Sequence, residues 1–551
     1  MSEPDRLPRE LRNRAFAWIT QDVDADTREE LEAVLARAMH GEPGAVADLA
    51  DRMAGPLRFG TAGLRGPVRA GSNGMNTAVV VRTTAGVAAW LAQRGKTGQI
   101  VVVGRDARHG SERFATAAAE VLYAAGFDAR LLPGPLPTPV LAFAVRELGA
   151  AAGVQITASH NPPADNGYKL YDESGSQIVP PSDAEIEAAI AEAPGAIRVE
   201  RTPGVPVLGN EIVDAYLAKV VAIPSGRSGA LRIAATALHG VGAQTLRRAL
   251  AAVGFEDVHL VAEQSEPDPD FPTVSFPNPE EPGATDLLLA LAAEVDADLA
   301  VALDPDADRC ALGVRDRDGA WRMLRGDETG VLLGEHVLST TKAQDPLVAT
   351  TIVSSSMLGR IAAEHGARYA ETLTGFKWLT RAGEGLVFAY EEALGLCVNP
   401  DFVRDKDGIA AAVMACDFAA GLKAEGRTLL DVLDDLAARH GVHVTDQVSL
   451  RVTDLGVRTE LMDSVRAAPP AVLAGTPVTA EDLSPGADAI RITGEGLRVV
   501  IRPSGTEPKL KTYLQVVEPV TGSLAEARAR ATSRLAALRQ DVESLLSSRR
   551  D

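Results

Sequence analysis

The stretch "QIVVVGRDARHGSERFATAAAEVLYAAGFDARLL", residues 99–132, contains the pattern that decides the fold class. An apolar run leads into a polar loop, then into a segment with helical apolar spacing, a glycine and a second apolar run. This spacing predicts a strand, a helix and another strand in that order. Strands joined by a helix pair in parallel, so the stretch predicts an α/β layer.

The same plan appears twice more, at residues 230–261 and 346–374. A unit that returns in this way predicts three related α/β domains. One large α/β sheet built from generic strand–helix units is the alternative. The length of 551 residues favours several domains, because one hydrophobic core rarely serves so long a chain.

The segments outside these three units have other residue patterns. Residues 1–55 read as helices, and the proline-rich stretch "EQSEPDPDFPTVSFPNPEEPGAT" (263–285) predicts an extended loop inside the second domain. After residue 446, short alternating runs precede an amphipathic helix from about residue 522, which predicts a C-terminal α+β domain. The expected domains are therefore 1–215, 216–325, 326–446 and 447–551.

Charge and composition limit the class of function. The formal net charge of −20 argues against a nucleic-acid or acidic-membrane partner. Three widely spaced cysteines predict no disulfide framework and a reducing, cytoplasmic location. No stretch approaches 18 apolar residues, and the first thirty residues lack the apolar core of a signal peptide.

A cluster of acidic residues, "DPDADRC" (304–310), follows an apolar run. Three carboxylates in one turn repel each other unless a cation lies among them, so the cluster predicts a Mg²⁺ site. A Ca²⁺ EF-hand loop is excluded, because Arg309 and Arg315 occupy the positions that require Gly and Glu. An aspartyl-phosphate enzyme and a solvated acidic loop remain open at this point.

Two loops rich in glycine and basic residues could bind an anion. "RPSGTEPKLK" (502–511) combines hydroxyl donors, a glycine and an arginine that can grip phosphate with two hydrogen bonds. "RFGTAGLRGPVRAG" (58–71) is similar, although neither contains a Walker motif. The stretches "ETLTGFKWL" (371–379) and "YEEALG" (390–395) add Lys377, Glu391 and Glu392, and the glutamates could accept hydrogen bonds from sugar hydroxyls. Each loop alone could equally be a surface turn.

The stretch "TASHNPPADNGYKL" (157–170) contains the candidate nucleophile, Ser159. A hydrolase of the G-x-S-x-G type is excluded by the residues around it, and a helix-capping or turn serine is the simpler reading. We expect His160 to point away from Ser159, because neighbouring side chains alternate along a strand. A turn serine, an acidic triad and a phosphate loop together favour phosphoryl transfer through a phosphoserine.

With these residues identified, the chain resembles the α-D-phosphohexomutase superfamily. The resemblance rests on five ordered motifs between residues 58 and 513: "FGTAGLRG", "TASHNP", "DPDADR", "YEEALG" and "RPSGTEP". It implies four domains around a central cleft, three α/β and one α+β. It also implies the conversion of a hexose 1-phosphate to its 6-phosphate through a hexose bisphosphate.

The resemblance assigns roles position by position. Ser159 looks like the phosphorylated residue, which with Asp304, Asp306 and Asp308 would bind Mg²⁺. Lys169 resembles the general acid/base. The residues that would line the transfer site are His160, Arg65 and Arg309. The residues that would bind the sugar phosphate are Thr374, Gly375, Lys377, Glu391, Arg502, Ser504, Gly505 and Thr506.

One departure from the family pattern affects the choice of sugar. Many relatives have a serine where this chain has Ala393, so one hydroxyl contact to the sugar is missing. "TLTGFKW", "YEEALG" and "RDKDG" (404–408) resemble the branch with phosphoglucomutases and phosphopentomutases. We expect glucose first, mannose next and a pentose as the alternative. A noncatalytic sugar-phosphate sensor is a further alternative. The protein is expected to be a monomer or a small homo-oligomer.

Overall fold

The computed structural model describes residues 7–58, 63–223, 230–451, 455–503 and 509–547. The chain divides into two compact units, each described by itself. The first unit comprises Met1–Met323 and Gly395–Ala420, and the second comprises Leu324–Leu394 and Gly421–Asp551. The four predicted domain boundaries stay predictions. None of the described helices is long and apolar enough to cross a membrane.

The first unit begins with three helices, as the sequence predicts, and they share a small hydrophobic core with Ala70. They are α1 (Arg9–Ile19), α2 (Ala25–Met39) and α3 (Ala45–Arg52). The side chain of Asp24 caps α2 by accepting a hydrogen bond from the backbone nitrogen of Asp26 at 3.1 Å.

The first sheet of this unit has the strand order β1-β5-β4-β2-β3. Strand β2 pairs in parallel with β3 and β4, and β5 is antiparallel to β4 and β1. Val101 and Val103 share one face of β2 and pack in the same core as Phe114 of α5. The strands are β1 (Leu64–Pro67), β2 (Ile100–Arg105), β3 (Asp128–Pro135), β4 (Ala152–Ile156) and β5 (Asp165–Asp172), and the helices are α4 (Thr77–Gln93), α5 (Ser111–Ala124), α6 (Thr138–Glu147) and α7 (Ser182–Glu192).

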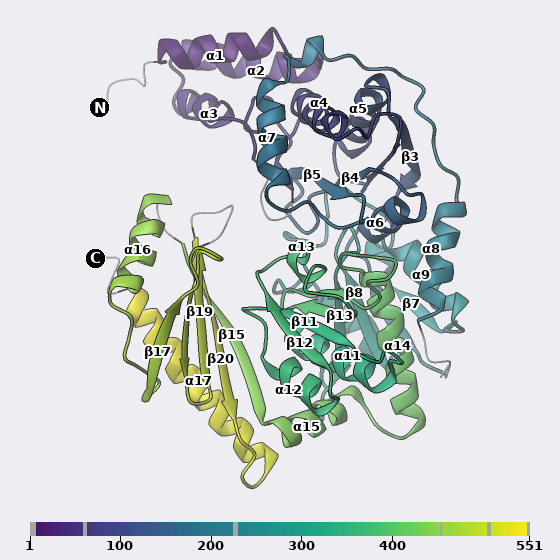
Figure 1. Ribbon diagram of the computed structural model, residues 1–551, viewed down its shortest axis with the longest axis vertical. Coiled ribbons are helices and arrows are strands. Elements are labelled where there is room, and N and C mark those ends of the chain that lie inside the picture. The colour runs from purple at the N-terminus through teal and green to yellow at the C-terminus, as the bar shows by residue number, and fades with distance from the viewer. Residues whose placement is uncertain (1–6, 59–62, 224–229, 452–454, 504–508, 548–551) are drawn as a thin grey trace. The chain divides into compact units, whose positions relative to one another are not determined.

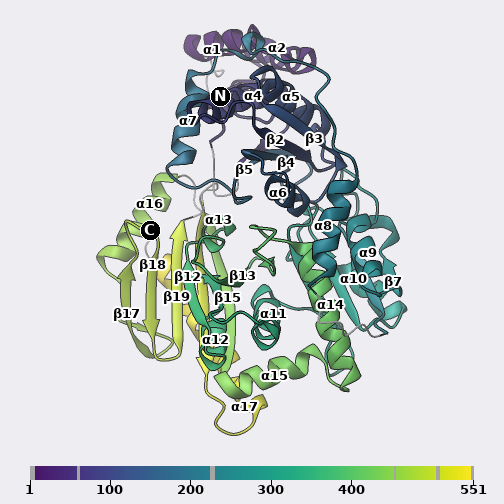
Figure 2. The same ribbon diagram turned by 45° about the vertical axis from the view of Figure 1, so that its right-hand side comes forward.

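The second sheet of the first unit has the order β10-β9-β8-β6-β7. Its strands are β6 (Ile233–Thr236), β7 (Val258–Leu260), β8 (Leu299–Leu303), β9 (Cys310–Arg315) and β10 (Trp321–Met323). Strand β6 is parallel to β7 and β8, and β9 is antiparallel to β8. Its helices are α8 (Glu211–Val221), α9 (Ala243–Ala252) and α10 (Asp286–Glu294), of which α8 and α9 lie beside β7 in both views (Figure 1, Figure 2).

The second unit contains the third α/β sheet. Strand β11 (Leu347–Thr351) lies between β12 (Arg368–Thr372) and β13 (Leu386–Glu391) and is parallel to both. In each of the three sheets, the first strand of the repeat (β2, β6 or β11) lies between two strands. One is the second strand of the repeat (β3, β7 or β12), and the other is the next strand in sequence (β4, β8 or β13). This shared order confirms the predicted threefold repeat. The helices are α11 (Gly326–Thr340), α12 (Met357–Glu364), α13 (Phe376–Leu379) and α15 (Leu429–His440).

The remainder of the second unit is an antiparallel sheet with the order β15-β20-β19-β18-β17-β16. Helix α17 (Leu524–Ser547) packs against it through Leu538 and Val542, which confirms the predicted α+β domain and its last helix (Figure 1). The other elements are β15 (Val442–Arg451), α16 (Leu455–Ala467), β16 (Val472–Leu473), β17 (Thr476–Asp482), β18 (Ile490–Gly494), β19 (Leu497–Pro503) and β20 (Lys509–Glu518).

One segment belongs to the first unit although it follows the third repeat in sequence. It is Gly395–Ala420, which contains β14 (Gly395–Cys397) and the start of α14 (Gly408–Ala424). Gly395 forms an isolated β-bridge with Arg309. This segment therefore lies against the loop that contains the acidic triad.

Candidate active site

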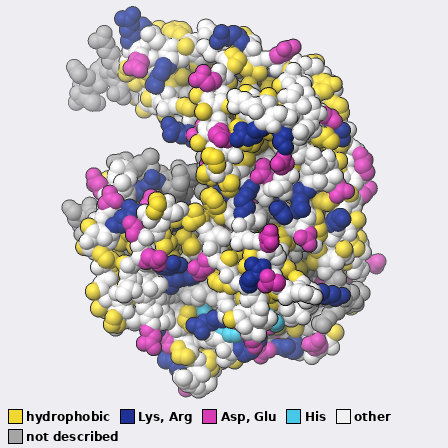
Figure 3. Space-filling view, viewed as in Figure 1, with side chains coloured by type: hydrophobic (Ala, Val, Ile, Leu, Met, Phe, Trp, Pro, Cys, Tyr) yellow, Lys and Arg dark blue, Asp and Glu magenta, His cyan; other side chains and the backbone are white. Residues whose placement is uncertain are grey.

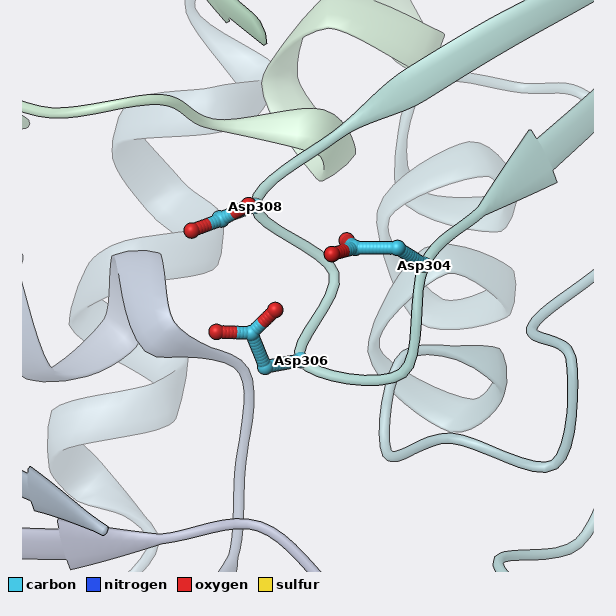
Figure 4. Close-up of side chains that lie close together, drawn as sticks. All are labelled: Asp304, Asp306 and Asp308. Carbon is cyan, nitrogen blue, oxygen red and sulfur yellow. The ribbon is translucent and has the colours of Figure 1, made fainter. Parts of the chain in front are cut away.

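The acidic triad lies in the turn between β8 and β9 (Figure 4). Asp304, Asp306 and Asp308 are fully buried, and one carboxylate oxygen from each lies within 4.8 Å of the others. One oxygen of Asp306 and one of Asp308, both Oδ1, are buried without a hydrogen-bond partner. Three hard oxygen ligands, with two buried oxygens that accept no hydrogen bond, fit a divalent cation.

Ser159 follows β4 in a turn and is almost completely buried. Its hydroxyl donates a hydrogen bond to Oδ2 of Asp304 at 2.8 Å. The Nδ1 atom of His160 lies 3.2 Å from the same hydroxyl. The expectation that His160 points away is therefore wrong. Strand β4 ends at Ile156, and Ser159 has a φ of 55°, so strand alternation does not apply.

Lys169 reaches the triad from β5. Its Nζ atom lies 2.7 Å from Oδ2 of Asp306 and 2.8 Å from Oδ2 of Asp308. Burial lowers the pKa of Lys169, but the carboxylates of Asp306 and Asp308 more than reverse this effect, and the net pKa is raised. Lys169 is therefore a protonated ammonium group in this arrangement.

A second lysine in the cluster, Lys406, was missed by the sequence reasoning. Its Nζ atom lies 2.9 Å from Oδ2 of Asp308. Gly408 allows the close approach, because a Cβ atom at this position would lie 2.4 Å from the carbonyl oxygen of Arg309. The sequence contains a signal in "RDKDG", a lysine between two aspartates that both prove to be buried.

The aspartates beside Lys406 hold its loop in place. Asp405 accepts hydrogen bonds from the Tyr171 hydroxyl at 2.7 Å and the Gln177 side chain at 2.9 Å. Asp407 accepts one from the Tyr216 hydroxyl at 2.7 Å. Burial raises the pKa of Asp407 to about 6.

Two arginines complete the cluster in the first unit. Arg65, on β1, donates a hydrogen bond to Oδ1 of Asn161 at 3.1 Å. Arg309 places its Nε atom 3.9 Å from Oδ1 of Asp308. The structure therefore brings together every site residue that the sequence predicts in the first unit. Their chemical roles stay predictions.

The carboxyl groups of the triad differ in pKa. Burial, followed by repulsion from Asp306 and Asp308, raises the pKa of Asp304 well above its usual value. Burial also opposes ionisation of Asp306 and Asp308, yet the Lys169 ammonium and hydrogen bonds hold both pKa values below the usual range. Burial and the nearby Arg309 and Arg65 lower the pKa of His160, so its ring is neutral near pH 7.

The residues predicted to bind the sugar phosphate belong to the second unit. Thr374, Gly375 and Lys377 lie at the start of α13, and Glu391 ends β13. Arg502, on β19, donates a hydrogen bond to the Tyr513 hydroxyl at 3.1 Å. Ser504, Gly505 and Thr506 lie outside the described residues.

The second glutamate of "YEEALG" has structural partners. Glu392 accepts hydrogen bonds from the hydroxyls of Thr351 at 3.1 Å and Ser354 at 2.9 Å. Its carboxylate ties the end of β13 to the loop after β11. The prediction that Glu391 contacts the sugar stays a prediction.

Comparison with known proteins identifies four consecutive domains. They are the phosphoglucomutase/phosphomannomutase α/β/α domains I, II and III and the C-terminal domain, matched at residues 56–195, 214–319, 325–440 and 449–529. Domains in this order, with the buried serine and acidic triad, define a phosphosugar mutase. The chain belongs to the phosphoglucomutase/phosphomannomutase family of the α-D-phosphohexomutase superfamily, and it is an enzyme of the intramolecular phosphotransferase type.

Individual relatives agree with this assignment. The chain is 42% identical over 452 residues to a Haemophilus influenzae protein named "Probable phosphomannomutase", covering 80% of this chain and 93% of the relative. It is 32% identical over 566 residues to the Mus musculus "Phosphopentomutase", covering 91% and 89%. A phosphoglucomutase/phosphomannomutase family protein from Burkholderia thailandensis has the same fold, with a TM-score of 0.69, 22% identity, and 89% and 97% of the two chains covered.

Proposed function

We propose that this enzyme interconverts a hexose 1-phosphate and the corresponding 6-phosphate through a phosphoserine at Ser159 and a hexose bisphosphate. Glucose is the favoured sugar, and mannose is next. The observation that carries the proposal is the hydrogen bond from the buried Ser159 hydroxyl to Asp304, 2.8 Å long, beside the triad and Lys169. A buried hydroxyl among charged groups of both signs has the surroundings that phosphoryl transfer requires.

The proposed reaction has two transfers. In the first, a sugar hydroxyl oxygen bonds to the phosphorus on Ser159 and its proton passes to Asp304 or His160, while the bond from phosphorus to Oγ breaks and Oγ takes a proton from Lys169. The bisphosphate then reorients, Oγ bonds to its other phosphorus, and the bond from that phosphorus to the sugar oxygen breaks, with the sugar oxygen taking a proton from Lys169. In the second transfer the serine proton leaves through Asp304 or His160, the two groups within hydrogen-bond distance of Oγ.

The cationic residues have separate parts in this scheme. Lys169 donates a proton or a hydrogen bond to the oxygen from which the phosphoryl group departs, because its raised pKa keeps it protonated. Arg65 and Arg309 line the path of the phosphoryl group and balance its charge. Lys406, in the segment Gly395–Ala420, pairs with Asp308 and favours its ionised form.

Asp304, Asp306 and Asp308, with an oxygen on Ser159, would hold Mg²⁺. When bound, the ion would supply positive charge that offsets the charge of the transferred group. The Oδ1 atoms of Asp306 and Asp308 support this assignment, because both are buried and neither accepts a hydrogen bond. The phosphate that is not reacting would bind to Arg502, Ser504, Gly505 and Thr506, and the sugar to Thr374, Gly375, Lys377 and Glu391.

A phosphopentomutase is the second candidate. Relatives named "Phosphopentomutase" and "Phosphoribomutase" match about 90% of the chain, a larger share than the first phosphomannomutase match. The human "Glucose 1,6-bisphosphate synthase", 32% identical, supports a sugar bisphosphate as the intermediate. These names give no support to a noncatalytic sensor. Three free, buried cysteines are consistent with the proposed cytoplasmic location.

The test combines mass spectrometry with a comparison of substrates. Peptide mass spectrometry of the purified enzyme should locate phosphate on Ser159. Ser159→Ala should lose turnover, whereas Ser174→Ala, in a polar turn of the same unit, should not. Normal turnover of Ser159→Ala would favour an aspartyl-phosphate route. Turnover of glucose, mannose and ribose 1-phosphates should be measured, each with its bisphosphate as primer. We expect kcat/KM to be highest for glucose 1-phosphate, lower for mannose 1-phosphate and lowest for ribose 1-phosphate. The highest kcat/KM for ribose 1-phosphate would establish the second candidate.

A further inference from the structure

Arg108 is a buried arginine in the loop between β2 and α5, and the proposed reaction does not use it. Only 4% of its surface is exposed. One end of its guanidinium group donates hydrogen bonds to the carbonyl oxygens of Ser159 and Asn161, both at 2.6 Å. The other end donates to the carbonyl oxygens of Pro162 at 2.8 Å and Asp165 at 3.1 Å.

Arg108 itself is held on two sides. Its Nε atom lies 3.4 Å from Oδ2 of the buried Asp106, and Asp106 also accepts a hydrogen bond from the Arg108 backbone nitrogen at 3.0 Å. The Phe271 ring covers the guanidinium, with its centroid 4.9 Å away. Phe271 belongs to the proline-rich loop 263–285, so this loop has a contact with the serine turn through Arg108.

The turn that Arg108 holds is conformationally demanding. Ser159 has a φ of 55°, a region that residues with a Cβ atom rarely adopt. Of the turn's own hydrogen bonds, one runs from the Ser159 backbone nitrogen to the Thr157 hydroxyl at 2.9 Å and one from Asn161 to Asp165 at 2.9 Å. The four carbonyl contacts of one rigid, planar group determine the orientation of the turn more than these local contacts do.

We propose that Arg108, covered by Phe271, is a positioning residue that fixes the turn of Ser159 so that Oγ faces Asp304. The proposal rests on the proposed function, because it concerns the residue that would carry the phosphoryl group. Lysine cannot replace this arginine, since an ammonium has three donors on one atom and cannot reach four carbonyls in a plane.

The experiment compares Arg108→Lys with a matched control, Arg113→Lys. Arg113 lies five residues further along, is about half exposed and pairs with Asp24. Arg108→Lys should lower kcat by about a hundredfold, the effect of misplacing a reacting group by about 1 Å, with little change in KM. The control should keep wild-type kcat. Single-turnover transfer from the phosphorylated enzyme to a sugar monophosphate should slow by the same factor as kcat.

Two further variants keep the proposal testable if Arg108→Lys folds poorly. In Arg108→Ala, added guanidinium ion should restore part of kcat and added ammonium should not. Phe271→Leu should lower kcat only a few-fold, because it leaves all four carbonyl contacts in place. A folded Arg108→Lys or Arg108→Ala enzyme with wild-type kcat and normal phosphoserine content would overturn the positioning role. Wild-type activity of Ser159→Ala would instead overturn the proposed function, so the two failures are distinguishable.

Discussion

Each unit of the molecule contains buried aspartates, but their surroundings differ. In the first unit, Asp306 and Asp308 lie against the Lys169 ammonium, and their pKa values are lowered. In the second unit, Asp327 accepts hydrogen bonds from the Ser355 backbone nitrogen at 2.6 Å, the Tyr390 hydroxyl at 3.1 Å and the Thr445 hydroxyl at 2.9 Å. Burial raises the pKa of Asp327 to about 6.

Asp306, Asp308 and Asp327 are all buried, so the difference between them lies in their partners: the Lys169 ammonium lowers the pKa of Asp306 and Asp308, whereas the neutral donors around Asp327 do not offset the rise that burial causes. Asp304 also has a raised pKa, because burial and repulsion from Asp306 and Asp308 both oppose its ionisation. The lysine keeps Asp306 and Asp308 ionised, so their charge is available for chemistry. The neutral donors bond to the Asp327 carboxyl group, which thereby links α11 to the loop after β11 and to β15. Changes in the charged cluster of the first unit should therefore reduce turnover or, where they break a buried ion pair, stability, and changes in the second unit should alter affinity or stability.

The largest effect is expected for Asp306→Asn. The change removes a proposed metal ligand and a partner of Lys169, so kcat should fall on the order of 10⁴-fold. Steady-state assays with added Mg²⁺ and with EDTA measure the effect. Asp318→Asn, in an exposed hairpin turn, serves as the control and should retain activity. Full wild-type activity in EDTA would contradict the metal assignment.

Lys406→Met tests the charge pairing directly. Removing this ammonium leaves Asp308 with one lysine fewer, and breaking a buried ion pair costs roughly 3–5 kcal/mol of stability. Thermal unfolding should therefore begin at a lower temperature. The matched change Lys423→Met, near the end of α14, should have a smaller effect because its side chain is exposed. Equal midpoints for the two variants would show that Lys406 is not part of the cluster's charge balance.

Arg502→Ala tests the second unit as a binding element. Loss of a charged hydrogen bond to phosphate costs roughly 1.5–3 kcal/mol, so KM should rise about ten- to a hundredfold. Some loss of kcat is expected as the bisphosphate escapes, and the phosphoserine content should stay near wild type. Arg528→Ala, at an exposed position of α17, is the control. An unchanged KM would mean that Arg502 does not hold the phosphate.

Asp327→Asn should change stability by an amount that depends on pH. The raised pKa stabilises the folded protein below pH 4, and this contribution is lost as the pH rises through about 6. The variant lacks it, so its stability relative to wild type should improve by roughly 1.5 kcal/mol from about pH 5 to about pH 7.5. Thermal midpoints at both pH values check this, and a pH-independent difference would refute it. Turnover at pH 7.5 should be unaffected.

The sequence predicts the fold better than it predicts the contacts of the site. The repeat at residues 99–132 contains its own strand and helix signals, so its topology follows from local patterns. Lys406 was missed because it is 98 positions from Asp308, and no local pattern encodes that contact. The direction of His160 was misjudged because a single left-handed residue, Ser159, breaks strand alternation.

The charged side chains of the surface and those of the buried site are distributed differently. On the face drawn in Figure 3, basic and acidic side chains are interspersed, and the excess of acidic residues forms no single patch. The positive charges that an anionic sugar phosphate needs are instead buried, as with Lys169 and Lys406. A reader of the sequence could count these lysines but could not place them, because their burial depends on strands distant in the chain.

Because Gly395–Ala420 belongs to the first unit, the order of synthesis decides when that unit can finish folding. About 70 residues separate Met323 from Gly395, and their synthesis takes roughly 4–14 s at the usual rate of translation. Through that interval Tyr171 and Tyr216 lack their carboxylate partners, and Asp308 lacks one of its two ammonium groups. The first unit thus cannot finish folding as an N-terminal domain. Its polar core is completed only when the nascent chain has emerged beyond the third repeat.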